Sequence, residues 1–125
     1  DASDLVRFYQ ALLQNPKGVW DDELLDDVTT NVRNTFPDPM FGVPIRRTLG
    51  LCTAGDDDKG TYRGFGKTGS PRRFGHNGAG GQLAWADPDT GVSVVYLTNG
   101  IDAHPIRQAK RGVALSSIAA EIVRP

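Results

Sequence analysis

The stretch FGHNGAGGQLAWADPDTGVSVVYLTNG, residues 74–100, decides the fold of this chain. It predicts two strands, over residues 82–86 and 92–98, joined by an Asp-Pro-Asp-Thr-Gly turn. Pro88 occupies the position that a type I turn favours for proline, and Gly91 supplies the left-handed residue that follows. Apolar residues point to both faces of the second strand, which predicts a central strand that is covered on both sides.

Three other segments show helical periodicity. The first is expected to begin at Asp1 or Ser3 and to end at Asn15. The second is expected to begin at Asp21 or Asp22 and to end where proline follows Phe36. The third follows Pro105, and its expected buried face consists of Leu115, Ile118, Ala119 and Ile122.

A period of two over residues 43–53 predicts one more strand, with Cys52 as a small buried side chain. The element order therefore predicts an α+β fold, an antiparallel sheet of about three strands flanked by helices. Such a sheet has two apolar faces and buries little by itself. We therefore expect a further layer to be supplied from outside this chain.

Length and composition narrow the classes of function. The 125 residues predict one domain, and 14 basic against 15 acidic side chains give no reason to expect a nucleic-acid partner. No apolar run is long enough for a membrane span. The single cysteine excludes an internal disulfide, which favours a cytoplasmic location. Two distant histidines and one cysteine make a poor metal site, and no cofactor is expected.

Several conspicuous residues have an ordinary structural interpretation. The acidic turn over residues 55–60 and the pair Arg72-Arg73 are expected to be solvated. His104 precedes a proline and is interpreted as a helix-entry residue. Trp85 and Tyr96 lie on neighbouring predicted strands and are expected to be core aromatics.

Three short motifs overlap between residues 61 and 81. Residues 64–69 satisfy G-x-G-x-x-G, but the Ser-Pro-Arg-Arg run that follows cannot open the helix that a dinucleotide site needs. A P-loop is excluded because Thr61 stands where its first glycine belongs. Lys67-Thr68-Gly69 spells a hydrolase motif, yet no strand continues from it. In contrast, the glycine-rich segment from His76 leads directly into the hairpin, and its glycines allow close backbone approach to a ligand.

Two motifs at fixed spacing indicate a family: FGHNGAGGQ at residues 74–82 and ADPDTG at residues 86–91. Together with the first helix, TLGL at 48–51 and LTNG at 97–100, they resemble the C-terminal part of the β-lactamase-related serine hydrolases. That group includes class C-like esterases and penicillin-binding-protein homologues, many of which carry His-x-Gly in place of Lys-Thr-Gly. The resemblance implies that residues 1–125 form the C-terminal, incomplete portion of a β-lactamase/transpeptidase-like domain.

The resemblance also implies roles for individual residues. His76 takes the place of the third-motif lysine and faces the catalytic pocket, and Gly78 leaves room for substrate beside the strand. The N–H of Ala79 is implied as one oxyanion-hole donor. Asn77 and Gly80 are implied substrate-binding positions, with the Asn77 side chain on the opposite face of the strand.

The family's nucleophile motif is absent from this sequence. No serine is followed by lysine three positions on, and no tyrosine by asparagine two positions on. We therefore expect part of a serine hydrolase that acts on a small ester or amide through an acyl-enzyme, with the chain inactive by itself. The His-Asn-Gly triplet favours an esterase over a β-lactamase. The alternative is a non-catalytic interaction module that pairs with the N-terminal part of the same protein or with a second copy.

Overall fold

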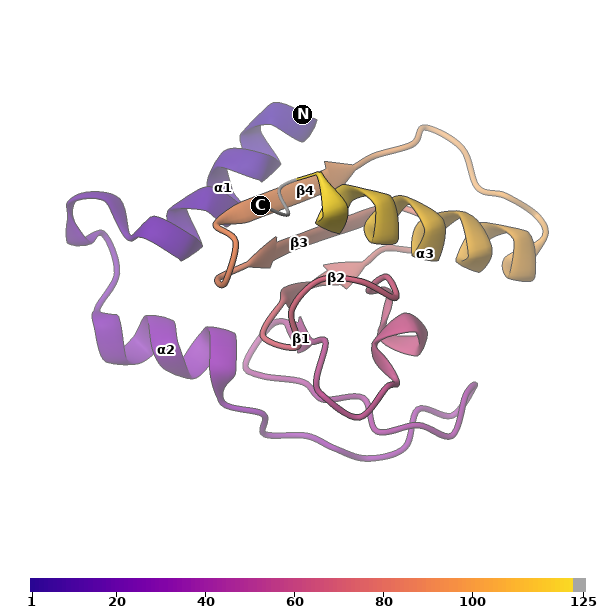
Figure 1. Cartoon of the computed structure of the whole chain (residues 1–125), viewed down its shortest axis with the longest axis horizontal. Helices are drawn as coiled ribbons and strands as arrows, with labels where there is room; N and C mark the ends of the chain where they lie inside the picture. Colours follow the sequence, from indigo (N-terminus) through magenta and orange to yellow (C-terminus); the bar gives the residue numbers. More distant parts are fainter. Residues whose placement is uncertain (123–125) are drawn as a thin grey trace.

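The computed structural model describes residues 1–122 and confirms the α+β class. Strands β1 to β4 form one antiparallel sheet in the order β1-β2-β3-β4, one strand more than expected. Two short 3₁₀ turns, Pro16–Gly18 and Gly60–Arg63, complete the described elements. The helices and strands, shown in Figure 1, are α1 (Ala2–Gln14), α2 (Asp22–Thr30), β1 (Cys52–Thr53), β2 (Phe74–Asn77), β3 (Leu83–Asp87), β4 (Val92–Tyr96) and α3 (Pro105–Glu121).

Each face of the sheet is covered by one helix of this chain. Helix α1 begins with a capping box between Asp1 and Asp4 and packs on β3 and β4. Its Tyr9 and Leu12 form an apolar cluster with Phe74, Ala84 and Ala86. Helix α3 covers the other face, where a second cluster contains Cys52, Ala54, Phe65, Leu83, Trp85 and Ala120. Each face of the sheet thus carries one layer from this chain, and the further layer expected from outside the chain stays a prediction.

Within residues 1–122, strand β4 lies at an edge of the sheet, whereas the sequence predicted a central position. Among residues 1–122 it pairs only with β3, which has β2 on its other side. All of β3 is buried, whereas every residue of β4 is only half-buried. Apolar side chains on both faces of β4 indicate two covering helices, but they carry no information on the strand's position in the sheet.

The predicted strand over residues 43–53 is broken in the structure. Arg46 adopts φ 50°, and the chain reverses at a turn in which Thr48 N–H donates to Leu51 O (2.9 Å). Only Cys52 and Thr53 join the sheet, and Arg47 forms an isolated bridge to Cys52. The residues with alternating hydropathy therefore do not form one strand, because a turn lies among them. Helix α2 likewise ends at Thr30, before the predicted proline stop.

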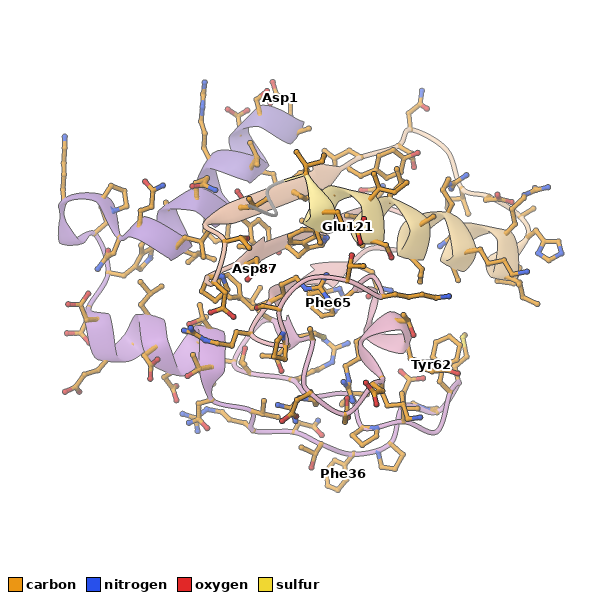
Figure 2. All side chains as sticks on the ribbon, in the orientation of Figure 1. Asp1, Phe36, Tyr62, Phe65, Asp87 and Glu121 are labelled. Atoms are coloured by element: carbon orange, nitrogen blue, oxygen red, sulfur yellow. The ribbon has the colours of Figure 1, made fainter. Side chains whose placement is uncertain are left out.

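Two arginines are buried, Arg63 and Arg73, and the second of them was expected to be solvated. Arg63 makes a bidentate pair with Asp57 (2.7 and 2.5 Å) and donates to Ala54 O and Pro44 O, so the acidic turn is tied to the core. This pairing lowers the pKa of Asp57. Arg73 is 3% exposed and lies over the rings of Phe65 and Trp85. Figure 2 shows Phe65 and Asp87 in the interior and Phe36 at the surface.

Helix α3 begins after His104, whose Nδ1 accepts from Arg107 N–H (3.4 Å), which confirms the helix-entry role. Of the four apolar residues that mark this helix in the sequence, Leu115 and Ala119 pack against the core, whereas Ile118 and Ile122 are 65% and 78% exposed. The buried positions are Ser116 and Ala120. The Ser116 hydroxyl accepts from the indole N–H of Trp85 (3.1 Å), so a polar residue belongs to the packed face.

Candidate active site

The segment singled out in the sequence forms the end of strand β2 and the loop to β3. His76 pairs with Ala84 and therefore lies on the face that α1 covers. Asn77 pairs with Leu83 and lies on the face that α3 covers, where it packs against Gly64. His76 is half-buried, while Asn77 and the two residues that follow it are exposed.

Both ring nitrogens of His76 have protein partners. Arg47 Nη1 lies 2.9 Å from Nε2, and Nδ1 contacts the backbone oxygen of Asn77. A guanidinium can only donate, so Nε2 is the acceptor of this hydrogen bond. Nδ1 then carries the ring proton and donates it to the carbonyl. These two contacts fit an imidazole that carries its proton on Nδ1.

An open cavity of about 220 Å³ lies beside His76 on the α1 face. Leu5 and Tyr9 from α1 and Leu97 after β4 give it apolar walls. Burial raises the pKa of the Tyr9 phenol, so this ring enters the cavity wall uncharged. The cavity therefore has largely apolar walls, with the imidazole of His76 as a polar group in its lining.

A smaller cavity of about 80 Å³ lies on the opposite face. Asn77 and Gly78 line both cavities, and the aromatic pair Phe41 and Tyr62 (5.6 Å between ring centres) borders the smaller one. The end of β2 therefore separates two hollows, and its exposed glycine is common to both.

The loop after β2 includes an exposed backbone donor, the N–H of Ala79. Gly78 N–H donates to Gln82 O (2.8 Å), which closes the hairpin. Ala79 is exposed, and within residues 1–122 its N–H has no protein acceptor. Gly80 is buried against Ile101, with φ 89°, and this contact packs the loop onto the segment that follows β4.

The competing motif lies elsewhere. Lys67 N–H and the Thr68 hydroxyl bind Ser117 of α3 (2.9 and 2.6 Å), so Lys67-Thr68-Gly69 is part of a loop fixed to a helix. Within the described part of the chain, no group of three potential metal ligands is present. The helices in that part include none that is long and apolar enough to cross a bilayer.

Arg47 and Tyr9 are site residues that the sequence reasoning missed. Arg47 lies 29 positions before His76 and outside any motif, so only the fold brings the two together. Tyr9 belongs to an apolar helical stripe, which predicts core packing and carries no signal for a cavity wall.

Comparison with known proteins agrees with this architecture. An esterase/β-lactamase, LipL, from Mycobacterium tuberculosis is 34% identical over 77 residues, which are 62% of this chain and 15% of LipL. A crystal structure of a β-lactamase from Mycobacterium bovis superposes with a TM-score of 0.70 at 28% identity. That match covers 91% of this chain and 41% of the other, so this chain spans less than half of either protein. The β-lactamase family model matches residues 1–117, and the chain therefore belongs to the β-lactamase family.

Proposed function

We propose that this chain forms one wall of a serine hydrolase active site, and that the nucleophile lies on another segment. The observation that carries the proposal is the exposed Gly78–Ala79 edge beside His76. Gly78 and the fixed imidazole of His76 line an open cavity there, and the backbone N–H of the next residue, Ala79, has no protein acceptor within residues 1–122.

The proposed reaction is acyl transfer in two steps. A serine hydroxyl from outside this chain attacks the acyl carbon, and its proton passes to the leaving alcohol or amine. Water then hydrolyses the acyl-enzyme. In both steps the carbonyl oxygen gains negative charge, and in this proposal the Ala79 N–H donates a hydrogen bond to it. One such donor contributes about 3 kcal/mol of transition-state stabilisation.

We favour an ester as the substrate. The position that carries lysine in many β-lactamases holds His76 here, and its two nitrogens are occupied by Arg47 and Asn77. The relative from M. tuberculosis is named an esterase as well as a β-lactamase. The apolar walls from Leu5, Tyr9 and Leu97 suit an uncharged acyl chain.

The test has two arms, with p-nitrophenyl acetate as the ester and nitrocefin as the β-lactam. The isolated chain is expected to show no burst with either compound, and a burst with acylation of one of its own serines would overturn the proposal. In a polypeptide that joins this chain to a Ser-x-x-Lys segment, His76→Ala is expected to lower kcat/KM for the ester about 100-fold. His104→Ala is the matched control, because that ring lies at the start of α3.

A second candidate function, pairing with another chain, is favoured by the edge of β4. The edge strand is followed by Leu97 and Ile101, which are 42% and 79% exposed. An open edge next to apolar side chains can accept a further strand. Sedimentation velocity of the chain, alone and mixed with the N-terminal part of the protein, tests this. A dimer or a complex supports pairing, and a monomer at high concentration in both samples opposes it.

A further inference from the structure

Backbone hydrogen bonds fix the position of Arg47, whose side chain contacts His76. Arg47 N–H donates to Asn34 O (2.9 Å), and Arg47 O accepts from Arg33 N–H (2.8 Å) and Asn34 N–H (3.1 Å). On its other side Arg47 bridges Cys52, which pairs with Gly75 next to His76. The Arg47 backbone is thus fixed from two sides, so its side chain starts from a defined position.

The Arg47 guanidinium has no acidic partner in the described part of the chain. Six other arginines there form ion pairs with aspartates, namely Arg7, Arg33, Arg63, Arg72, Arg107 and Arg111. The only side-chain hydrogen bond of Arg47 within residues 1–122 is the one to His76. Its charge is therefore not neutralised locally, although the side chain is exposed and in contact with water.

We propose that Arg47 is the positioning residue for His76. It fixes the neutral Nδ1–H tautomer and brings a positive charge to the site without protonating the imidazole. The importance of this arrangement for catalysis rests on the proposed function, whereas the arrangement itself does not. A hydrolase that places lysine at this position has a charged side chain on the strand. Here the charge comes from a different segment and reaches the strand through His76.

The chain contains an internal reference for this proposal. The Nδ1 atom of His104 accepts from Arg107 N–H, so the proton of its neutral ring lies on Nε2. The two histidines of the sequence are therefore expected in opposite tautomers. Long-range ¹H–¹⁵N correlation spectra of the labelled chain at pH 7.5 distinguish the two forms, and His104→Gln assigns the signals.

The wild-type spectrum alone can overturn the inference. The expected result is a protonated Nδ1 and an unprotonated Nε2 for His76. A protonated Nε2, alone or together with Nδ1, would contradict it. Because no substrate is needed, this outcome is independent of the hydrolase proposal. An inactive protein with the expected tautomer would refute only the hydrolase.

Substitution then tests the role of Arg47. Arg47→Met keeps much of the volume and removes the donors, so loss of the single-tautomer pattern is expected for His76 but not for His104. Arg7→Met is the matched control, because Arg7 is an exposed helical arginine that makes only a 3.7 Å contact with Asp4. Arg47→Lys retains a donor and is expected to restore the Nδ1–H form. An unchanged His76 signal in folded Arg47→Met would refute the role, as would its loss in folded Arg47→Lys.

Discussion

Phe74 and Gly75, at the start of strand β2, are buried, whereas Asn77, Gly78 and Ala79, at its end, are exposed. The first pair contributes to the packing between the two helix-covered faces. Asn77 and Gly78 border two cavities, and Ala79 carries a backbone N–H without a protein acceptor in residues 1–122. His76 lies between the two regions and is half-buried.

The difference shows how a short strand can position a site rigidly. The buried end is fixed by pairing with both β1 and β3, and the open end continues the same backbone toward solvent. Site residues on regular elements are placed more accurately than those on free loops. Substitutions at the two ends are therefore expected to have different consequences, for folding at one end and for chemistry at the other.

The largest effect is expected for Gly75→Ala. An added Cβ would lie 2.2 Å from Ala84 O and 2.6 Å from Trp85 Cα, and neither backbone atom can move without separating β2 from β3. We expect a loss of about 3 kcal/mol in the free energy of unfolding, or no folded protein. Urea unfolding followed by tryptophan fluorescence measures this. Gly50→Ala is the control, since its Cβ meets nothing within 4 Å. A loss below about 1 kcal/mol would contradict the close packing of the buried end.

The sequence predicted individual helices and strands better than it predicted which of them pack against one another. The β3–β4 hairpin, the cap at Asp1 and the start of α3 depend on local signals, and all three are found. The edge position of β4 and the exposure of Ile118 depend on which elements meet. Hydropathy reports what a side chain prefers, but it does not report whether this fold supplies a covering surface.

The candidate site divides in the same way. The triplet at residues 76–78 was found from its glycines and its place before the hairpin. Arg47 was not found, because the turn that follows it brings its backbone beside Cys52 and interrupts the alternating pattern. The burial of Arg73 was equally hidden, since its stabilising contacts are the rings of Phe65 and Trp85. Long-range contacts of charged side chains leave no periodic signal in a sequence.

The next largest effect on the free energy of unfolding is expected for Asp57→Asn, which breaks the pair between Asp57 and the buried Arg63. The guanidinium of Arg63 is 2% exposed, and Asp57 is its only acidic partner in the described residues. Breaking a buried pair is costly, although the carboxylate is 34% exposed, so we expect a loss of about 2 kcal/mol. Equilibrium unfolding at pH 7 measures it. Asp56→Asn, on the same exposed turn, is the control and is expected to change little.

This pair also predicts a direction for pH. Hydrogen bonds from Arg63 hold the pKa of Asp57 below its ordinary value of 3.8. The folded state therefore binds this proton less readily than the unfolded chain, and the stabilisation is complete above pH 3.8 and is lost as the pH falls below it. Between pH 6 and pH 2, the free energy of unfolding should fall less steeply with decreasing pH in Asp57→Asn than in the wild type. Equal slopes would show that Asp57 does not contribute to acid lability.

A smaller effect is expected where α3 meets the buried end, for Ser116→Ala. The Ser116 hydroxyl is fully buried and accepts from the indole N–H of Trp85, the residue that pairs with Gly75. Its removal leaves a buried donor without a partner, which costs about 1.5 kcal/mol. Ser117→Ala would not be a clean control, because that hydroxyl accepts from Lys67 N–H. Ser3→Ala, on the exposed first turn of α1, serves instead.

The smallest effect on stability, and the sharpest test of the comparison, is Gly78→Ala. The nearest atom to an added Cβ is Gln82 Cβ at 3.4 Å, and Gly78 is not among the glycines with positive φ. The unfolding free energy should therefore change by less than about 0.5 kcal/mol.

In the polypeptide that includes the nucleophile, the same methyl group would occupy the edge against which the substrate is proposed to lie. The value of kcat/KM is then expected to fall about 10-fold or more, because small displacements of a reacting group are costly. Gly100→Ala, whose added Cβ would meet nothing within 4 Å, should change neither quantity. An unchanged rate in folded Gly78→Ala would place the substrate elsewhere, and unfolding would show that the open end is as tightly packed as the buried one.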